Sequence, residues 1–303
     1  MTKGSFILGC FNSLLVTANT LLVLLLIPFT LLKIMFPVKG IRLFCNKAMV
    51  MISNQWIDNN SKVLTRQKTQ IEISGDVENL SLEKSYLVIS NHQSWADIVI
   101  LQYLFNRKIP FLRFFLKREL IWVPLLGFAW WALDFPFMKR YSKEYLKKHP
   151  EMKGKDYETT RKACEKFKEL HVSVINFLEG TRFTHEKHKN RKSRFQYLLN
   201  PKAGGIALVM SSMGDYINNI LNITIVYPGN HNPPKFWDLL SGNIPAVKVH
   251  IEEMRVPPEL IHGNYEEDDA FRQNFQEWVN QLWISKDQNI ARMKGVQQTG
   301  SKD

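Results

Sequence analysis

Runs of apolar residues, separated by polar and turn-forming stretches, predict the elements of this chain. Short runs rich in β-branched residues indicate strands at 71–75, 85–90, 172–178, 221–227 and 247–251. Longer periodic stretches indicate helices at 48–64, 157–170 and 271–284, and a further helix follows the strand at 85–90. Strands that alternate with helices in this way predict an α/β layer architecture. We find no internal repeat.

The first apolar run differs from the others in its length, because no charged residue occurs from Gly4 to Leu32. As a helix it would span roughly 43 Å, more than the ~30 Å hydrocarbon core of a bilayer. It is too long for a secretory signal, so we expect it to be retained. Asn12, Asn19 and Pro28 interrupt the run, and a tilted span and a bent helical pair both fit it. A buried core helix is the alternative, which the length disfavours.

The charges around this run predict its orientation. Four cations follow the run, at Lys33, Lys39, Arg42 and Lys47, whereas Lys3 alone precedes it. The positive-inside rule therefore predicts that the rest of the chain lies on the cytoplasmic side, at the inner membrane if the protein is bacterial. We divide the chain into a membrane-anchoring segment at 1–47, a large domain at 48–290 and a disordered tail at 291–303.

Composition narrows the class of partner. The net charge of +12 favours anionic partners, which include phospholipid, an acidic carrier protein and nucleic acid. No nucleic-acid-binding motif occurs, and the long apolar run argues against that class. The three cysteines have neither paired nor metal-ligand spacing, which indicates a reducing compartment without disulfides.

Candidate chemistry begins where the strand at 85–90 runs into Asn91 and His92. Asp97 follows in the first turn of the next helix, which Ser94 is placed to cap. On an unbroken helix His92 and Asp97 would point roughly 140° apart, so they meet only if His92 lies in a loop. Asp97 would then orient the imidazole, which is left to accept a proton from a hydroxyl. The alternative is a capping box, in which Asp97 serves the helix alone.

A second polar stretch follows the strand at 172–178 and runs from Glu179 to Thr184. It combines an arginine, Arg182, with Gly180 and the hydroxyl of Thr181. Glycine lets backbone amides approach a ligand, and arginine binds phosphate oxygens in pairs, so the stretch is typical of a phosphate site.

These stretches belong to four ordered blocks that resemble the lysophospholipid and glycerol-phosphate acyltransferase family. The match spans Val88 to Pro228. The first block is Asn91-His92 with Asp97, and the third is Phe177-Leu178-Glu179-Gly180-Thr181-Arg182-Phe183. The second is Lys117-Arg118-Glu119-Leu120 with Pro124, Gly127 and 137–140, and the fourth is Val226-Tyr227-Pro228. Tyr227 departs from the aliphatic residue that is more usual there. Segments 184–188 and 229–233 are most similar to the longer branch, which includes lysophosphatidate and lysocardiolipin acyltransferases.

The resemblance implies a glycerolphosphate-acyltransferase-like α/β fold, with a mixed sheet flanked by helices and an N-terminal membrane-embedded helix or bent helical pair. It also implies a reaction of phospholipid biosynthesis. A fatty acyl group passes from acyl-CoA or acyl-ACP to the free sn-2 hydroxyl of lysophosphatidic acid, with no further cofactor. Lysophosphatidylglycerol and lysocardiolipin are alternative acceptors. A catalytically inactive membrane scaffold is the alternative of another class.

The implied site has His92 and Asp97 as catalytic residues. The expected substrate-binding residues are Glu179, Gly180, Thr181, Arg182, Lys117 and Arg140. A backbone amide or Lys117 would stabilise the oxyanion, and Glu179 would hold a polar group of the acceptor or orient Arg182. The lysines beside His185 and His188 make this stretch more typical of a charged loop than of a metal site, so we expect no metal. The expected partners are membrane phospholipids, the lysophospholipid acceptor and the acyl donor, and not nucleic acid.

Overall fold

The computed structural model describes most of the chain. The described residues are 3–67, 69–138, 148–149, 171–214, 216–217, 219–229, 232–261, 263–265 and 267–295. The helix expected at 157–170, Arg140 and the end of the expected tail lie outside them.

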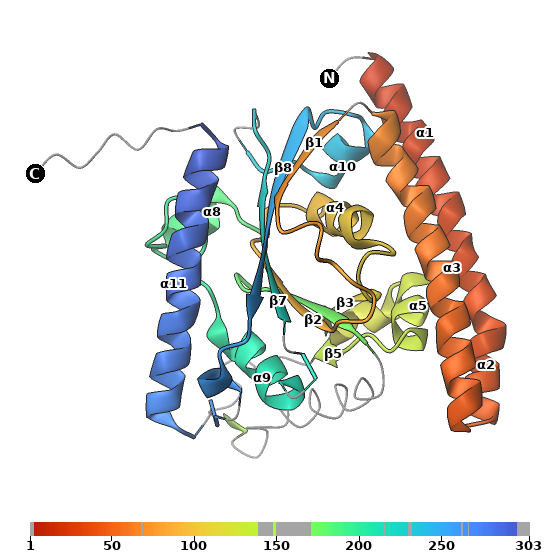
Figure 1. Ribbon diagram of the computed structural model, residues 1–303. Helices are drawn as coiled ribbons and strands as arrows, with labels where there is room; N and C mark the ends of the chain where they lie inside the picture. Colours follow the sequence, from red (N-terminus) through yellow and green to blue (C-terminus); the bar gives the residue numbers. More distant parts are fainter. Residues whose placement is uncertain are drawn as a thin grey trace, which may run out of the picture.

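A six-stranded mixed sheet forms the centre of the molecule (Figure 1). Its order is β1 (Gln70–Gly75), β8 (Ala246–Arg255), β7 (Asn219–Val226), β2 (Tyr86–Ser90), β6 (Ser173–Phe177) and β3 (Leu112–Phe114). Only the β7–β8 pair within it is antiparallel. The predicted α/β fold with a mixed sheet is therefore confirmed, and each predicted strand is present within a few residues of its expected bounds.

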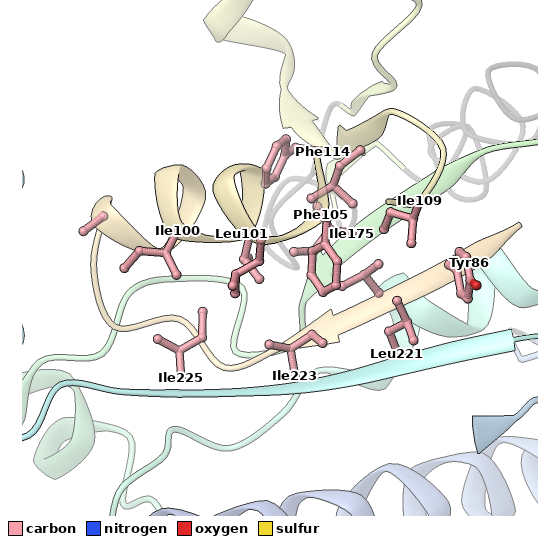
Figure 2. Packing of buried hydrophobic residues seen from close by; sticks show 14 of the residues in the cluster. Tyr86, Ile100, Leu101, Phe105, Ile109, Phe114, Ile175, Leu221, Ile223 and Ile225 are labelled. Atoms are coloured by element: carbon pink, nitrogen blue, oxygen red, sulfur yellow. The ribbon is translucent and has the colours of Figure 1, made fainter. Parts of the chain in front are cut away.

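The run at β2 is apolar at nearly every position because all five residues of the strand are buried. Successive side chains point to opposite faces of a strand. Val88 accordingly joins the core under α4 (Ala96–Phe105), whereas Leu87 and Ile89 join the core under α9 (Ala203–Met213) and α11 (Asp269–Met293). Figure 2 shows the first of these cores, where α4 packs on Ile223 and Ile225 of β7.

The apolar N-terminal run forms one long helical arm, made of α1 (Lys3–Thr20), the 3₁₀ turn η1 (Leu21–Leu25) and α2 (Leu26–Met35). Helix α3 (Lys39–Arg66) runs back beside it (Figure 1). The stretch from Lys3 to Met35 is long and apolar enough to cross a membrane, and 17% of its most apolar window is buried.

Asn12 and Asn19 of this arm face the protein and lie within α1, which they do not interrupt. Asn12 donates to the carbonyl of Leu240 at 2.7 Å, and Asn19 donates to the carbonyl of Trp56 at 2.8 Å. The domain boundary expected at residue 47 falls inside α3, so the anchoring segment and the large domain share one continuous helix.

The helices α3 and α11 are longer than the predicted ranges 48–64 and 271–284. Helix α11 begins where Asp268 accepts from the N–H of Phe271 at 2.9 Å, and it continues to Met293. The sequence did not predict this extension because the stretch after Ile284 is mostly polar, and Ile290 is one of its few buried apolar residues. The remaining elements are β4 (Leu116–Lys117), η2 (Arg118–Trp122), α5 (Leu126–Ala132), β5 (Phe137–Met138), α8 (His185–Asn190), α10 (Phe236–Leu240) and η4 (Pro258–Leu260).

Candidate active site

His92 lies in the irregular segment 91–94 between β2 and α4, at the carboxyl edge of the sheet. Phe177, the last residue of β6, stacks on its imidazole with ring centroids 4.0 Å apart. The chain bends before the helix begins, so Nδ1 of His92 reaches Oδ2 of Asp97 at 2.9 Å. A carboxylate only accepts hydrogen bonds, so Nδ1 carries the proton and Nε2 has the free lone pair.

Asp97 lies in the first turn of α4 and has no exposed surface. Its Oδ2 also accepts from the backbone N–H groups of Gln93 at 2.7 Å and Ser94 at 2.9 Å. The sequence left open whether Asp97 caps the helix or orients His92. The carboxylate contacts the imidazole, and its bonds to these two amides hold the turn before α4, whose N-cap residue Trp95 makes no side-chain cap.

The second oxygen of Asp97 accepts from the hydroxyl of Tyr227, with Oη 2.5 Å from Oδ1. Tyr227 directly follows β7 and is 3% exposed. Burial, and then the charge of Asp97, raises the pKa of Tyr227 well above its usual value, so the hydroxyl keeps its proton and donates. Sequence reasoning noted Tyr227 only as a replacement for an aliphatic residue and missed this contact.

Arg182 lies at the same edge of the sheet as His92. The N–H of Phe183 donates to the carbonyl of His92 at 2.7 Å, which ties the two loops together. The guanidinium of Arg182 lies over the indole of Trp95, 4.8 Å from the ring centroid. Arg182 is exposed, and Trp95 is 46% exposed at the start of α4. The cation and the imidazole are therefore held by adjoining segments, and an anion in solvent can reach Arg182.

Glu179 turns inward and has no exposed surface. Its Oε1 accepts from the N–H of His92 at 2.9 Å, and its Oε2 accepts from the N–H of Leu199 at 3.1 Å. Burial raises its pKa to about 8, against the opposing effect of these two amides. Neither oxygen is directed at Arg182 or at solvent, so the geometry does not support the substrate contact expected from the sequence. Glu179 instead holds the backbone of the loop that carries His92.

Gly180 and Thr181 form the turn between Glu179 and Arg182. Gly180 has φ of 65°, a left-handed conformation that glycine adopts without strain. The hydroxyl of Thr181 accepts from Nζ of Lys187 at 2.9 Å, and the same ammonium donates to the carbonyl of Arg182 at 3.0 Å. Lys187, which sequence reasoning did not select, thus adds a second cation beside the predicted phosphate site.

Comparison with known proteins agrees with this geometry. A family model described as Acyltransferase matches residues 70–227, more than half of the 303 residues, and this match includes every site residue described so far. The chain belongs to the Acyltransferase family.

Curated relatives of the chain carry the names of acyltransferases. The chain is 26% identical over 216 residues to mouse 1-acyl-sn-glycerol-3-phosphate acyltransferase epsilon, covering 64% of this chain and 56% of the relative. It is 23% identical over 289 residues to the human delta protein, covering 87% of this chain and 70% of that protein. The chain thus spans little more than half the length of the mouse relative.

A solved structure shows the same fold. The crystal structure of the 1-acyl-sn-glycerophosphate (LPA) acyltransferase PlsC from Thermotoga maritima matches with a TM-score of 0.52, at 17% identity and over 98% of both chains. The match extends over the N-terminal helices as well as the sheet, because it covers nearly the whole of each chain.

Two predicted substrate-binding residues, Lys117 and Arg140, are not joined to this arrangement. Lys117 ends β4, shortly after β3 leaves the sheet at the same edge as His92. Its exposed side chain makes no hydrogen bond or ion pair with any residue in the described part of the chain. Arg140 lies outside the described residues, so the roles of both stay predictions.

A groove of about 670 Å³ lies at the opposite end of α4 from His92. One face of α3, which includes Leu43 and Lys47, forms one wall, and the segment from Gln102 to Arg113 forms the other. Its lining is mostly apolar. Neither His92 nor Arg182 lines it, so the groove and the candidate active site are separate features.

His185 and His188 lie in the short helix α8, where a charged loop was expected. The ring of Phe183 contacts both imidazoles, with centroids 5.4 and 5.6 Å away. Nε2 of His188 lies 2.7 Å from the carbonyl of Phe195. These contacts give both histidines packing roles. Among the described residues no cluster of three histidine, cysteine or acidic side chains is arranged to hold a metal ion.

Proposed function

We propose that this protein transfers a fatty acyl group from acyl-CoA or acyl-ACP to the free sn-2 hydroxyl of lysophosphatidic acid, which gives phosphatidic acid. The observation that carries the proposal is the His92–Asp97 pair, held beside an exposed arginine by the loops that follow β2 and β6. The names of the curated relatives support the same acceptor.

In the proposed reaction the sn-2 oxygen attacks the thioester carbonyl carbon. As the C–O bond forms, Nε2 of His92 takes the hydroxyl proton, and Asp97 stabilises the resulting imidazolium through Nδ1. The tetrahedral intermediate then collapses, the C–S bond breaks, and the imidazolium returns the proton to the leaving thiolate. The products are the ester and free thiol, so no further cofactor enters the balance. A positioned base of this kind contributes about 10²–10⁴-fold to the rate.

The acceptor must be held so that its hydroxyl faces Nε2. We assign its phosphate to Arg182, with Gly180, Thr181 and Lys187 beside it, because charge-assisted hydrogen bonds to phosphate are strong and directional. Fixing the hydroxyl against the base is a large source of rate in its own right. A backbone amide or Lys117 would stabilise the oxyanion.

We also propose that the arm formed by α1, η1 and α2 anchors the protein in a membrane. Exposed apolar side chains run along it, including Phe6, Phe11, Leu24 and Leu31. Such a surface is unfavourable in water and favours a lipid environment. By the positive-inside rule, the active site would face the cytoplasm.

The decisive assay offers membranes containing the protein a panel of lysophosphatidic acid, lysophosphatidylglycerol and lysocardiolipin, each with acyl-CoA or acyl-ACP, and measures products by mass spectrometry. We expect phosphatidic acid to form fastest, and His92→Ala to lower its rate at least about 100-fold. His250→Ala is the matched control, since this histidine lies on β8 and contacts Ser74.

Each other outcome has a distinct meaning. Preference for lysocardiolipin or lysophosphatidylglycerol would assign a different acceptor to the same site. Inactivity of the wild-type protein on every acceptor would support the scaffold alternative, and full activity of His92→Ala would exclude the proposed base. Sealed vesicles of known orientation, with acyl-CoA added outside, test on which side the site lies.

A further inference from the structure

The contact between Tyr227 and Asp97 arises from the order of the sheet. Strand β2 lies between β6 and β7, and all three are parallel to one another, with Ser90 opposite both Phe177 and Ile223. Their carboxyl ends therefore meet at one edge. Strand β7 continues beyond this point, and Figure 2 shows its Ile225 beneath the first turns of α4.

Asn91 extends the pairing of β2 with β7 into the loop. Its side-chain amide donates to the carbonyl of Ile225 and accepts from the N–H of the same residue, both at 2.9 Å. These two bonds fix the position of Ile225 relative to the His92 loop. Tyr227 follows two residues later, which places its hydroxyl 2.5 Å from Oδ1 of Asp97.

The two oxygens of Asp97 have separate sets of partners. Oδ2 accepts from Nδ1 of His92 and from two backbone amides. Among the described residues, Oδ1 accepts from the hydroxyl of Tyr227. Asp97 is completely buried, so water does not replace a lost donor without rearrangement. The phenol therefore fixes the rotation of the carboxylate and draws part of its charge away from the imidazole.

We propose that Tyr227 is a positioning residue for His92, acting through Asp97, which rests on the proposed function. By donating to Oδ1 it sets both the orientation of the carboxylate and the strength with which that carboxylate holds a protonated imidazole. Hydrogen bonding to a carboxylate stabilises its charge and weakens its pull on a neighbouring cation.

Other ionisable groups lie around this chain of contacts, and the test leaves them unchanged. Glu179 approaches His92 from the loop after β6, and Lys286 of α11 interacts electrostatically with Glu179. Arg182 lies over Trp95 at the solvent side. Tyr227→Phe removes one hydroxyl and retains the ring, so these groups keep their packing.

We expect Tyr227→Phe to lower kcat about tenfold, with the KM for lysophosphatidic acid within about twofold of wild type. The acidic limb of the kcat/KM profile should move to higher pH, by about half to one unit, because the imidazolium is then held more tightly. Tyr86→Phe is the matched control. Tyr86 is also a fully buried tyrosine of this sheet, but it lies at the opposite end of β2, and its hydroxyl accepts from the N–H of Ser81.

An unchanged profile, a shift to lower pH, or an equal shift in Tyr86→Phe would overturn the inference. If Tyr227→Phe does not fold, 3-fluorotyrosine placed at position 227 tests the same point from the other side, since this stronger donor should move the acidic limb to lower pH. Isotope-labelled histidine supplies a readout that needs no turnover. The NMR titration midpoint of His92 should move to higher pH in Tyr227→Phe and to lower pH with 3-fluorotyrosine. A wild-type protein without activity would thus defeat the proposed function and leave this inference to be decided by NMR.

Discussion

Replacement of Glu179 by glutamine tests how the loop carrying His92 is held. The side chain has no exposed surface, and its two oxygens accept from the backbone N–H groups of His92 and Leu199. Because its pKa is raised to about 8, the comparison is made at pH 9, where the group is an ionised carboxylate. Glutamine keeps the shape and one acceptor oxygen, but its amide nitrogen cannot accept. One of the two backbone donors is therefore left unpaired inside the protein. An unpaired buried donor costs about 1–3 kcal/mol.

This cost has two measurable consequences. The thermal unfolding midpoint should fall by roughly 2–10 °C for a domain of this size. The reaction rate should also fall by about tenfold, because a rise of about 1.4 kcal/mol in the activation free energy lowers the rate by a factor of ten. The loss should appear in kcat, with the KM for lysophosphatidic acid unchanged, since Glu179 does not face solvent. Differential scanning fluorimetry and steady-state kinetics in the same detergent measure both quantities.

Glu186→Gln is the control for charge, because Glu186 is exposed on α8 and lies close to Glu179 in the sequence. A surface change of this kind should alter stability by less than about 0.5 kcal/mol. The reasoning is refuted if Glu179→Gln keeps the wild-type unfolding midpoint and raises only the KM for the acceptor. That result would return Glu179 to the substrate contact that the sequence suggested.

Two further predictions concern cations. Arg182→Gln should raise the KM for lysophosphatidic acid about 10- to 100-fold with a smaller effect on kcat, since a charge-assisted contact to phosphate is lost; an unchanged KM would remove Arg182 from the phosphate site. Lys286 is buried on α11, donates to the carbonyl of Ile223 at 2.6 Å, and has its pKa lowered by burial from 10.5 to about 7. Above about pH 8, where Glu179 has lost its proton, and up to pH 10.5, Lys286 binds its proton in the unfolded chain and not in the folded one, so its contribution to the unfolding free energy should rise with pH by up to about 1.4 kcal/mol per unit. Urea unfolding at several pH values should show this slope in the wild type and not in Lys286→Met.

Local patterns in the sequence determined much of the fold. Strands β2 and β6 were evident because a strand buried on both faces is apolar at nearly every position. The spacing of His92 and Asp97 excluded a common helix and required a bend, which the structure has. The length and composition of the N-terminal run likewise identified a segment long and apolar enough to cross a membrane, because these properties need no tertiary context.

The partners of the buried polar groups depended on tertiary structure. Glu179 was expected to contact substrate, yet it bonds to two backbone amides of its own fold. Tyr227 and Asp97 are 130 positions apart, and only the placing of β2 between β6 and β7 brings them together. A sequence pattern reports burial and local conformation, since these arise from neighbouring residues. It does not report the order of strands in a sheet, and that order decides which side chains meet at the edge where His92 lies.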